Sequence, residues 1–270
     1  MKKRTAKDGL VADFFHDGSG QPRKAVILLG GSEGGKRWSA WPLAIVTTRL
    51  VERGYNVLSL AYFKANGLPG SLEEIPLEYF EKTFEWLAAQ PEVVSNKYAL
   101  IGGSKGGELS LLLGSMFANI KAVVGLLPSS VVWQGIPRSI LATGKQPRSS
   151  WSYRGAGLPY LPSSLSSRDI LAMLSMRMRN IMEKDLAEVE RHPEAVIPVE
   201  RTEGAILLVS GKKDRIWPST AMSNQIVNRL EEKGFENYYQ HIVFESGHSS
   251  VLWNRTCWRT VFSFLNDNFM

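Results

Sequence analysis

The segment Gly102-Gly103-Ser104-Lys105-Gly106 places one serine between glycines, directly after an apolar run. This G-x-S-x-G spacing is typical of a nucleophile elbow, a sharp strand-to-helix turn that exposes a serine hydroxyl. Glycines are needed there because a Cβ two residues before or after the serine would collide with the neighbouring strand and helix. The same pattern also fits a glycine-rich turn that binds a phosphate or no ligand, so the chemistry depends on an acid and a histidine elsewhere.

Two further residues, Asp214 and His248, have the types that would activate a serine. A serine hydroxyl is a poor nucleophile until a histidine takes its proton, and a carboxylate must hold that histidine in the right tautomer. Asp214 closes an apolar run, and His248 lies between a glycine and a serine after another apolar run, unlike a buried structural histidine. We therefore predict Ser104, Asp214 and His248 as nucleophile, acid and base. A simple turn aspartate is the alternative for Asp214.

The chain offers other histidines and another aspartate for these roles, and each is a weaker candidate. His16 lies in a polar N-terminal segment, His192 precedes a proline, and His241 lies within a predicted strand. Asp185 belongs to a long segment outside the regular pattern of the chain. These four residues stay open as alternatives for the base and the acid.

Apolar runs alternate with amphipathic stretches along most of the chain, which predicts strands alternating with helices. Continuous apolar runs of strand length indicate strands that are buried on both faces. We expect strands at 25–29, 55–62, 98–101, 120–127, 205–211 and 239–244. We expect helices at 41–53, 75–90, 108–117, 219–233 and 253–268, and a helix-like stretch at 167–191. This alternation predicts a mostly parallel sheet with right-handed crossovers and helices on both faces.

The three candidate residues each follow the carboxyl end of a predicted strand, in the chain order serine, acid, histidine. This is the order of the α/β-hydrolase fold. Open α/β sheets place their sites at the carboxyl ends of the strands, so the three side chains are expected at one edge of the sheet. The sequence therefore predicts the α/β class and, within it, an α/β-hydrolase fold.

The glycine-rich segment 30–35 follows the first predicted strand and is a candidate oxyanion hole. Backbone N–H groups stabilise the charge on the substrate oxygen in acyl transfer, and one of them comes from the residue after the nucleophile, here Lys105. The second comes from the loop after the first central strand, where we predict the N–H of Ser32, with Gly31 as the neighbouring alternative. A nucleotide-binding loop is the other interpretation, but neither G-x-G-x-x-G nor a following GK[ST] is present.

Between residues 128 and 198 the alternation breaks off, and we call this segment the excursion. It contains many proline, glycine, aromatic and methionine residues. A long segment inside a compact α/β domain is usually functional, and methionine and aromatic side chains suit a wall around an adaptable apolar guest. We predict a lid or cap here, with Trp133 and Trp151 as substrate contacts. Ordinary core contacts of an inserted helix are the alternative.

Length and composition point to one soluble domain over residues 1–270, with 44% hydrophobic and 21% charged residues. The sequence has no signal-peptide h-region and no apolar run of ~18 residues, and its single cysteine, Cys257, has no partner for an internal disulfide. We therefore expect a cytoplasmic protein with Cys257 as a packed core thiol.

The net charge of +6 suits an anionic small substrate. The sequence has no basic helix, zinc spacing or RNA-binding motif that would indicate a nucleic-acid partner.

Several motifs of the chain occur together in one known family. They are Leu-Ala-Tyr-Phe at 60–63 with Leu-Pro at 68–69, Leu-Glu-Tyr-Phe-Glu at 77–81, Gly-x-Ser-Lys-Gly-x-Glu at 102–108, Val-Ser-Gly-Lys-Lys-Asp at 209–214, Trp-Pro-Ser at 217–219 and Gly-His at 247–248. From about Ala25 to its end the chain thus resembles the catalytic domain of the acyl-CoA thioesterase and bile acid-CoA:amino acid N-acyltransferase family. The resemblance implies nucleophile, acid and base roles for Ser104, Asp214 and His248.

Two departures from the family pattern refine this expectation. Members with acyl-CoA activity carry a β-sandwich domain before the catalytic one, and few residues precede Ala25 here, so we expect that domain to be absent. The amino acid transferase branch uses a cysteine nucleophile, whereas position 104 is serine. Because a serine ester is generally resolved by water, hydrolysis is favoured over transfer to an amine.

The sequence thus predicts a serine hydrolase that cleaves acyl thioesters, acyl-CoA above all, through an acyl-Ser104 intermediate and without a metal or cofactor. Four cationic residues are candidate contacts for the CoA phosphates, with ordinary surface charge as the alternative: Lys36, Arg37, Lys64 and Lys105. Two other functions stay open. One is a carboxylic ester or lactone hydrolase resembling dienelactone hydrolases, and the other is a non-catalytic ligand-binding protein on a hydrolase scaffold.

Overall fold

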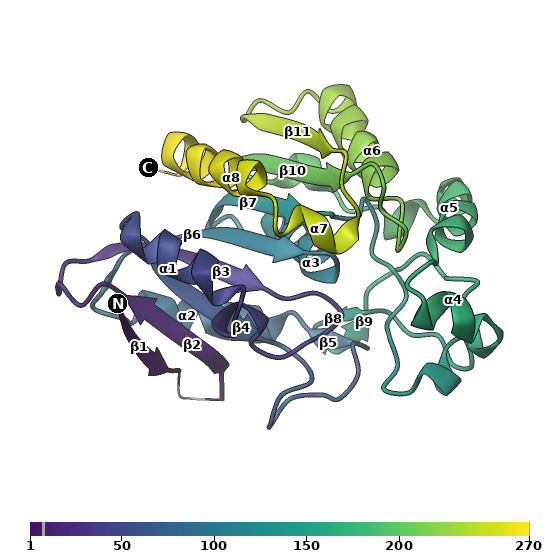
Figure 1. Cartoon of the computed structure of the whole chain (residues 1–270), viewed down its shortest axis with the longest axis horizontal. Helices are drawn as coiled ribbons and strands as arrows, with labels where there is room; N and C mark the ends of the chain where they lie inside the picture. The colour runs from purple at the N-terminus through teal and green to yellow at the C-terminus, as the bar shows by residue number, and fades with distance from the viewer. Residues whose placement is uncertain (7–8, 270) are drawn as a thin grey trace.

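The computed structural model describes residues 1–6 and 9–269, which fold around one sheet with helices on both sides (Figure 1). Within these residues eight strands form the sheet in the order β1-β2-β4-β3-β6-β7-β10-β11. Their bounds are β1 Lys2–Thr5, β2 Val11–His16, β3 Arg23–Leu29, β4 Asn56–Ala61, β6 Val93–Gly103, β7 Ile120–Leu126, β10 Ala205–Gly211 and β11 Tyr239–Phe244. In this spatial order, β4, β3, β6, β7, β10 and β11 are all parallel to their neighbours. Strand β2 pairs antiparallel with β4. This confirms the predicted α/β fold.

The N-terminal strands β1 and β2 extend the sheet where no strand is expected from the sequence. In the antiparallel pair of β2 and β4, Phe14 lies opposite Leu58, and both side chains are fully buried. Arg4 of β1 forms an ion pair with Glu92 at 3.0 Å. Four consecutive residues of β2 are buried, so its pattern lacks the alternation by which a half-buried strand is recognised. Pairing with β4 stabilises it instead.

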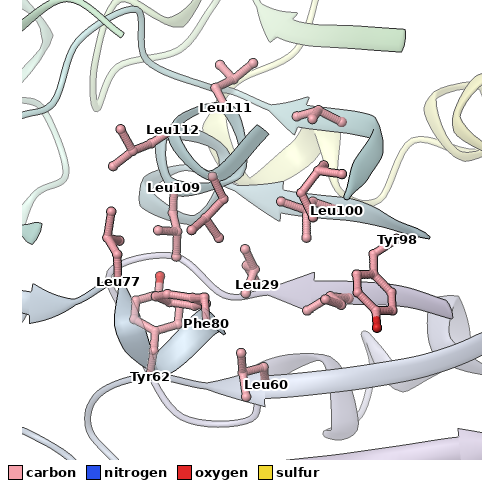
Figure 2. Packing of buried hydrophobic residues seen from close by; sticks show 14 of the residues in the cluster. Leu29, Leu60, Tyr62, Leu77, Phe80, Tyr98, Leu100, Leu109, Leu111 and Leu112 are labelled. Carbon is pink, nitrogen blue, oxygen red and sulfur yellow. The ribbon is translucent and has the colours of Figure 1, made fainter. Parts of the chain in front are cut away.

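Helices cover both faces of the sheet. Their bounds are α1 Ala44–Glu52, α2 Glu78–Ala88, α3 Lys105–Met116, α6 Ser219–Glu232 and α8 Arg255–Asn268. Successive residues of a strand point to opposite faces, so Leu28 packs in the cluster with α1 and α8 while Leu29 packs in the cluster with α2, α3 and α6. Figure 2 shows part of the latter, where Leu29 and Leu100 of the sheet face Leu109 of α3. The central strands are therefore buried on both faces.

Cys257 lies on α8, in the cluster that this helix forms with α1 and the sheet. Its side chain is fully buried, and burial raises the pKa of the thiol to about 12. The thiolate is the reactive form of cysteine, so this residue is chemically inert in the folded protein. It is the packed core thiol that the sequence predicts.

The excursion leaves the sheet after β7 and returns to it at β10, and in Figure 1 it lies beyond the carboxyl ends of the parallel strands. Two of its strands, β8 Trp151–Tyr153 and β9 Ala156–Gly157, form a small sheet with β5 Ile75–Pro76. Because Ile75 and Pro76 pair with β8, the helix expected from residue 75 begins at Glu78 instead.

The helix-like stretch expected over 167–191 is broken into two short helices, α4 Ile170–Leu174 and α5 Arg179–Ala187. The Ser175 hydroxyl donates to the Leu171 carbonyl at 2.6 Å, and Met176 adopts a left-handed conformation with φ 55°. The helix ends here because the serine side chain bonds back to the preceding turn and the next residue is left-handed. The expectation of one continuous helix is therefore wrong.

After β11 the chain forms the four-residue helix α7 His248–Val251, at a position expected to be a loop. The Ser250 hydroxyl accepts from the Gly247 N–H at 2.9 Å and so caps this short helix. Among the described residues, no helix combines the length and the apolar character that crossing a bilayer requires.

Candidate active site

Ser104 lies at a sharp turn between β6 and α3, with φ 55° and ψ −121°. A non-glycine residue at positive φ is strained, and such strain persists only where the surroundings hold it. Two glycines permit the close approaches around it. A Cβ on Gly102 would collide with the Gly106 carbonyl group, and a Cβ on Gly106 would lie 2.6 Å from the Leu29 carbonyl oxygen. The glycines are thus needed for the steric reason inferred from the sequence.

Asp214 and His248 form a close pair in which Nδ1 of the imidazole lies 2.7 Å from Oδ2 of the carboxylate. The carboxylate is 1% exposed, and it accepts hydrogen bonds from the Ile216 N–H at 2.9 Å and the Ser219 hydroxyl at 2.9 Å. These donors fix its orientation. The Trp217 ring packs edge-on against the imidazole, with 6.1 Å between centroids. A carboxylate held in this way can orient the ring and stabilise its protonated form.

Backbone contacts connect the elbow to the loop that carries the histidine. The Ser104 N–H donates to the Leu126 carbonyl at the end of β7, at 2.8 Å. Next along the sheet edge, Leu127 packs against Gly211 at the end of β10, and a Cβ on Gly211 would lie 2.6 Å from the Ser246 carbonyl oxygen. The elbow and the acid and histidine loops therefore lie at one edge of the sheet. Among the described residues, the Ser104 hydroxyl makes no hydrogen bond, so its oxygen is unengaged.

The two backbone segments predicted as an oxyanion hole meet beside Ser104. A Cβ on Gly31 would lie 3.2 Å from the Ser104 Cβ, so the loop after β3 reaches the elbow. The Gly31 N–H donates to the Glu33 carboxylate at 3.2 Å and is thereby engaged. Ser32 and Lys105 line the same cavity as Ser104. The Lys105 N–H belongs to the first turn of α3, whose N–H groups have no intrahelical partner. Of the two alternatives for the second donor, the Gly31 N–H is thus the one that already has an acceptor among the described residues.

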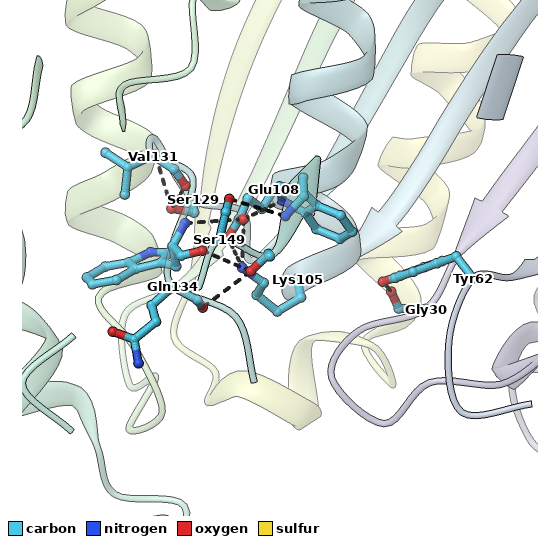
Figure 3. A network of polar contacts seen from close by, with 11 residues as sticks. Gly30, Tyr62, Lys105, Glu108, Ser129, Val131, Gln134 and Ser149 are labelled. Carbon is cyan, nitrogen blue, oxygen red and sulfur yellow. Dashed lines mark hydrogen bonds and ion pairs between the residues drawn. The ribbon is translucent and has the colours of Figure 1, made fainter. Parts of the chain in front are cut away.

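Behind the elbow, Lys105 and Glu108 form a buried ion pair, with Nζ at 2.6 and 2.7 Å from the two carboxylate oxygens (Figure 3). Their side chains are 5% and 0% exposed. Glu108 also accepts from the Trp151 indole N–H at 2.8 Å and from the Trp133 backbone N–H at 3.3 Å. Burial raises the pKa of the Glu108 carboxyl, and the Lys105 ammonium opposes that rise. Glu108 is not among the site residues predicted from the sequence, although its i,i+3 spacing from Lys105 permits this pair.

Ser104 opens into a cavity of about 380 Å³. The sheet side contributes Ser32, Lys64, Lys105, Ile216 and Trp217 to its wall. The rest of its lining lies between residues 133 and 182 of the excursion and is largely apolar, including Ile136, Leu165, Met173, Met178 and Met182. Such a wall suits an apolar guest of variable shape. In the described part of the chain, no group of three histidine, cysteine or acidic side chains is arranged to hold a metal ion.

The structure places the predicted substrate contacts in different surroundings. Lys64 and Trp133 line the cavity, and the Lys64 ammonium donates to the Ser32 carbonyl at 3.1 Å. Lys36 lies outside the lining and forms an ion pair with Asp13 at 2.7 Å, and Arg37 is also outside the lining. Trp151 is fully buried behind the wall and bonds to Glu108. Lys105, the fourth cationic candidate, also lines the cavity, but its ammonium is buried against Glu108, so it is not a phosphate contact. Of the predicted substrate contacts, Lys64 and Trp133 remain in the cavity lining.

Like Asp214 and His248, the alternative acid and bases are not part of the cavity lining. His241 of β11 lies 2.8 Å from the Ser210 hydroxyl, which is fully buried in the sheet. His192 lies 3.7 Å from Glu194 in the excursion, and His16 ends β2. Asp185 accepts hydrogen bonds from Ser163 and Ser164 and so holds two turns of the excursion together. Among the described residues, the His248–Asp214 pair is the one in which an imidazole bonds to a buried carboxylate.

Solved structures with the same fold are esterases and related hydrolases. The Pyrococcus furiosus esterase Pf2001 superposes with a TM-score of 0.61 at 18% identity, over 99% of this chain and 91% of that one. A putative dienelactone hydrolase from Klebsiella pneumoniae superposes with a TM-score of 0.60 at 11% identity, over 97% of this chain and 92% of that one. At such identities the likeness concerns the fold, which is that of the α/β hydrolases.

Curated relatives are acyl-coenzyme A thioesterases. Mitochondrial acyl-coenzyme A thioesterase 2 of Mus musculus is 32% identical over 241 residues, which are 87% of this chain and 47% of the relative. Acyl-coenzyme A thioesterase 1 of Rattus norvegicus is 30% identical over 253 residues, which are 92% of this chain and 54% of the relative. The chain spans about half the length of the curated relatives it matches.

A sequence model of one family matches residues 75–250, which are well over half of the chain and include the elbow, the acid and the histidine. This match confirms the resemblance seen in the motifs. The chain belongs to the BAAT / Acyl-CoA thioester hydrolase C terminal family.

Proposed function

We propose that this protein hydrolyses acyl thioesters, with acyl-CoA as the substrate class, through a covalent acyl-Ser104 intermediate. The observation that carries the proposal is the His248–Asp214 pair at 2.7 Å, on the sheet edge where Ser104 is held in a strained turn. The acyl-coenzyme A thioesterases among its relatives support the choice of substrate. Ser104, His248 and Asp214 then act as nucleophile, base and orienting acid.

In the first half of the reaction the Ser104 hydroxyl oxygen attacks the thioester carbonyl carbon while His248 Nε2 takes the hydroxyl proton. The Asp214 carboxylate, at Nδ1, stabilises the imidazolium that forms. The N–H groups of Ser32 and Lys105 donate to the carbonyl oxygen as it becomes negative. Collapse of this intermediate breaks the carbon–sulfur bond, and the leaving thiolate receives the proton from His248.

In the second half a water molecule attacks the acyl-serine ester. His248 takes one proton from the water, the same two N–H groups hold the oxyanion, and collapse releases the carboxylic acid. The proton on His248 returns to the Ser104 oxygen. The net reaction is thioester plus water giving carboxylic acid plus thiol, and the protein returns to its starting state.

The excursion acts as the cap of this site within a single domain over residues 1–270. Leu165 and three methionines of the excursion form part of the apolar wall of the cavity that begins at Ser104. An acyl chain placed there loses contact with water, and burial of each methylene is worth about 0.8 kcal/mol. The preference for chain length then depends on the excursion.

The experiment is a panel of acyl-CoA thioesters of graded chain length, with release of free thiol as the readout. Wild type is expected to release thiol, and Ser104→Ala to fall to background. Ser263→Ala serves as the control, because this hydroxyl is exposed on α8 and bonds only to Asp267. Thiol release by Ser104→Ala above background contradicts the mechanism.

Carboxylic ester hydrolysis is the competing function, because the solved structures of the same fold include esterases. The same panel is therefore run with p-nitrophenyl esters of matched chain length. We expect a higher kcat/KM for acyl-CoA than for the ester of the same chain. The reverse order identifies an ester hydrolase.

A further inference from the structure

A second hollow, of about 280 Å³, lies on the outer surface beside the cavity of Ser104. Arg177, Arg179, Asn180 and Arg215 line it. Three guanidinium groups around one hollow produce a strong local positive potential, since the charges reinforce one another in a concave surface. None of these arginines is among the residues predicted from the sequence as phosphate contacts.

The three arginines differ in how they are held. The Arg179 guanidinium donates to the Lys212 and Asp214 carbonyl groups, both at 3.1 Å, and pairs with Glu183 at 2.7 Å. It therefore fixes the start of α5 onto the loop that carries the acid. Arg177 and Arg215 are exposed, and neither guanidinium forms an ion pair or hydrogen bond within the described residues. These two are free to bind an anion.

The start of α5 adds a second feature that favours an anion. This nine-residue helix has no side-chain cap at its N-terminus. The Arg179 N–H donates to the Arg215 carbonyl at 3.0 Å, but among the described residues no acceptor engages the next N–H, that of Asn180 in the hollow. Unengaged N–H groups and the helix dipole at this end attract negative charge.

The hollow adjoins the cavity through residues next to one another in the chain. Met178 lies between Arg177 and Arg179 and lines the cavity, and Ile216 follows Arg215 and also lines the cavity. Each of the two segments thus presents an apolar side chain to the cavity and guanidinium groups to the outside. A ligand can reach from one to the other across Met178 and Ile216.

We propose that Arg177, Arg215 and the first turn of α5 bind the phosphate groups of the CoA part of the substrate. The inference rests on the proposed thioesterase function. CoA carries its phosphates at the far end of a neutral pantetheine arm, so a thioester at Ser104 requires a cationic site at a distance, with a less polar passage between. Exposed guanidinium groups suit phosphate because they donate two parallel hydrogen bonds to it.

Binding is measured first, by calorimetry with free CoA and with pantetheine, which lacks the phosphates. Wild type is expected to bind CoA about tenfold or more tightly than pantetheine, as charge-assisted hydrogen bonds would give. The double variant Arg177→Gln/Arg215→Gln is expected to lose this difference. The matched control is Arg53→Gln/Arg259→Gln, which removes the same charge from another surface hollow, between α1 and α8. It is expected to retain the difference.

Kinetics separate a phosphate site from a structural role. In the Arg177→Gln/Arg215→Gln variant, KM for octanoyl-CoA is expected to rise about tenfold or more. KM for the octanoyl thioester of N-acetylcysteamine, which carries no phosphate, and kcat for both are expected to stay unchanged. A parallel rise in both KM values overturns the proposal.

The calorimetric measurement also distinguishes failure of the phosphate site from failure of the proposed hydrolase function. If wild type cleaves no thioester but binds CoA through these arginines, the hydrolase proposal fails and the phosphate site stands. If wild type binds CoA and pantetheine equally, the phosphate site fails whatever the hydrolysis assay gives. Binding of wild type to phosphatidylglycerol vesicles without any preference for CoA assigns the arginines to lipid headgroups and likewise overturns the proposal.

Discussion

The edge of the sheet and the excursion that faces it are built in different ways. At the edge, backbone groups approach so closely that Gly102 and Gly106 leave no space for a Cβ, and the Asp214 carboxylate is fixed by several donors. In the excursion, short helices and turns follow one another, and Leu171 and Leu174 of α4 are 78% and 69% exposed. The Ser104 turn and the Asp214 carboxylate are thus held by rigid elements, while the pocket wall belongs to a segment with fewer constraints.

Glu108 joins these two regions. It lies on α3, directly below the elbow, and accepts hydrogen bonds from Trp151 and from the backbone of Trp133 in the excursion. Glu108 thus provides a buried polar anchor between the excursion and the α3 helix that follows Ser104. Changes at the edge, at this anchor and in the wall are expected to affect different quantities.

The largest effect is expected at the edge. Asp214→Asn keeps the size of the side chain but allows the wrong imidazole tautomer, so kcat for acyl-CoA is expected to fall about 10³–10⁴-fold. Steady-state thiol release measures it, and the thermal midpoint shows that the fold is retained. Asp267→Asn, on the exposed side of α8, is the control and should leave kcat unchanged. A fall of less than about tenfold in Asp214→Asn would mean that this pair does not drive the reaction.

The next effect concerns the anchor. Glu108→Gln leaves the buried Lys105 ammonium without a carboxylate, and the free energy of unfolding is expected to fall by about 3–5 kcal/mol. Urea unfolding followed by tryptophan fluorescence measures this change. Lys105→Met/Glu108→Gln removes the uncompensated charge and is expected to recover much of the loss. Equal stability of the single and double variants would contradict the role given to the ion pair.

A smaller and more selective effect is expected in the wall. Met173 of α4 lines the cavity, whereas Leu171 on the same helix is exposed and outside the lining. Met173→Ala removes apolar contacts with the distal part of an acyl chain, so KM for long-chain acyl-CoA is expected to rise by about tenfold, with kcat unchanged. KM for short-chain acyl-CoA should not change. The Leu171→Ala variant should keep the wild-type KM for every chain length. An equal change in KM for short-chain and long-chain acyl-CoA would contradict a wall that determines the preference for chain length.

We expect the Cys257 thiol to be unreactive while the protein is folded. Burial raises the pKa of this thiol to about 12, so at pH 8 it stays protonated and shielded. A chromogenic disulfide reagent is expected to react with no thiol of the native protein and with one thiol per chain in urea. Rapid reaction of the native protein would show that the face of the sheet under α8 opens more readily than its packing indicates.

Much of the edge could be predicted from the sequence because it depends on local rules. The glycines around Ser104 and the order of serine, acid and histidine after successive apolar runs are enough to indicate an elbow and its partners. Parallel strands with both faces buried also leave a clear apolar run. The pairing of Asp214 with His248 follows from that topology, since the carboxyl ends of parallel strands meet at one edge.

The remaining features depend on contacts between distant segments. β2 is stabilised by its pairing with β4, and the break between α4 and α5 depends on Ser175 and the left-handed Met176. Glu108 and Trp151 are 43 residues apart, and their bond appears only when the excursion folds back. Similarly, Arg177 and Arg215 share a hollow only because α5 packs on the loop after β10.

The most direct test of the proposed mechanism is the site of covalent labelling by a fluorophosphonate, read by peptide mass spectrometry. One label per chain, on Ser104, is expected in wild type. The label should be lost in Ser104→Ala and slowed strongly in His248→Ala, because the serine needs its base. A label on another residue, or none on active wild-type protein, would contradict Ser104 as the nucleophile.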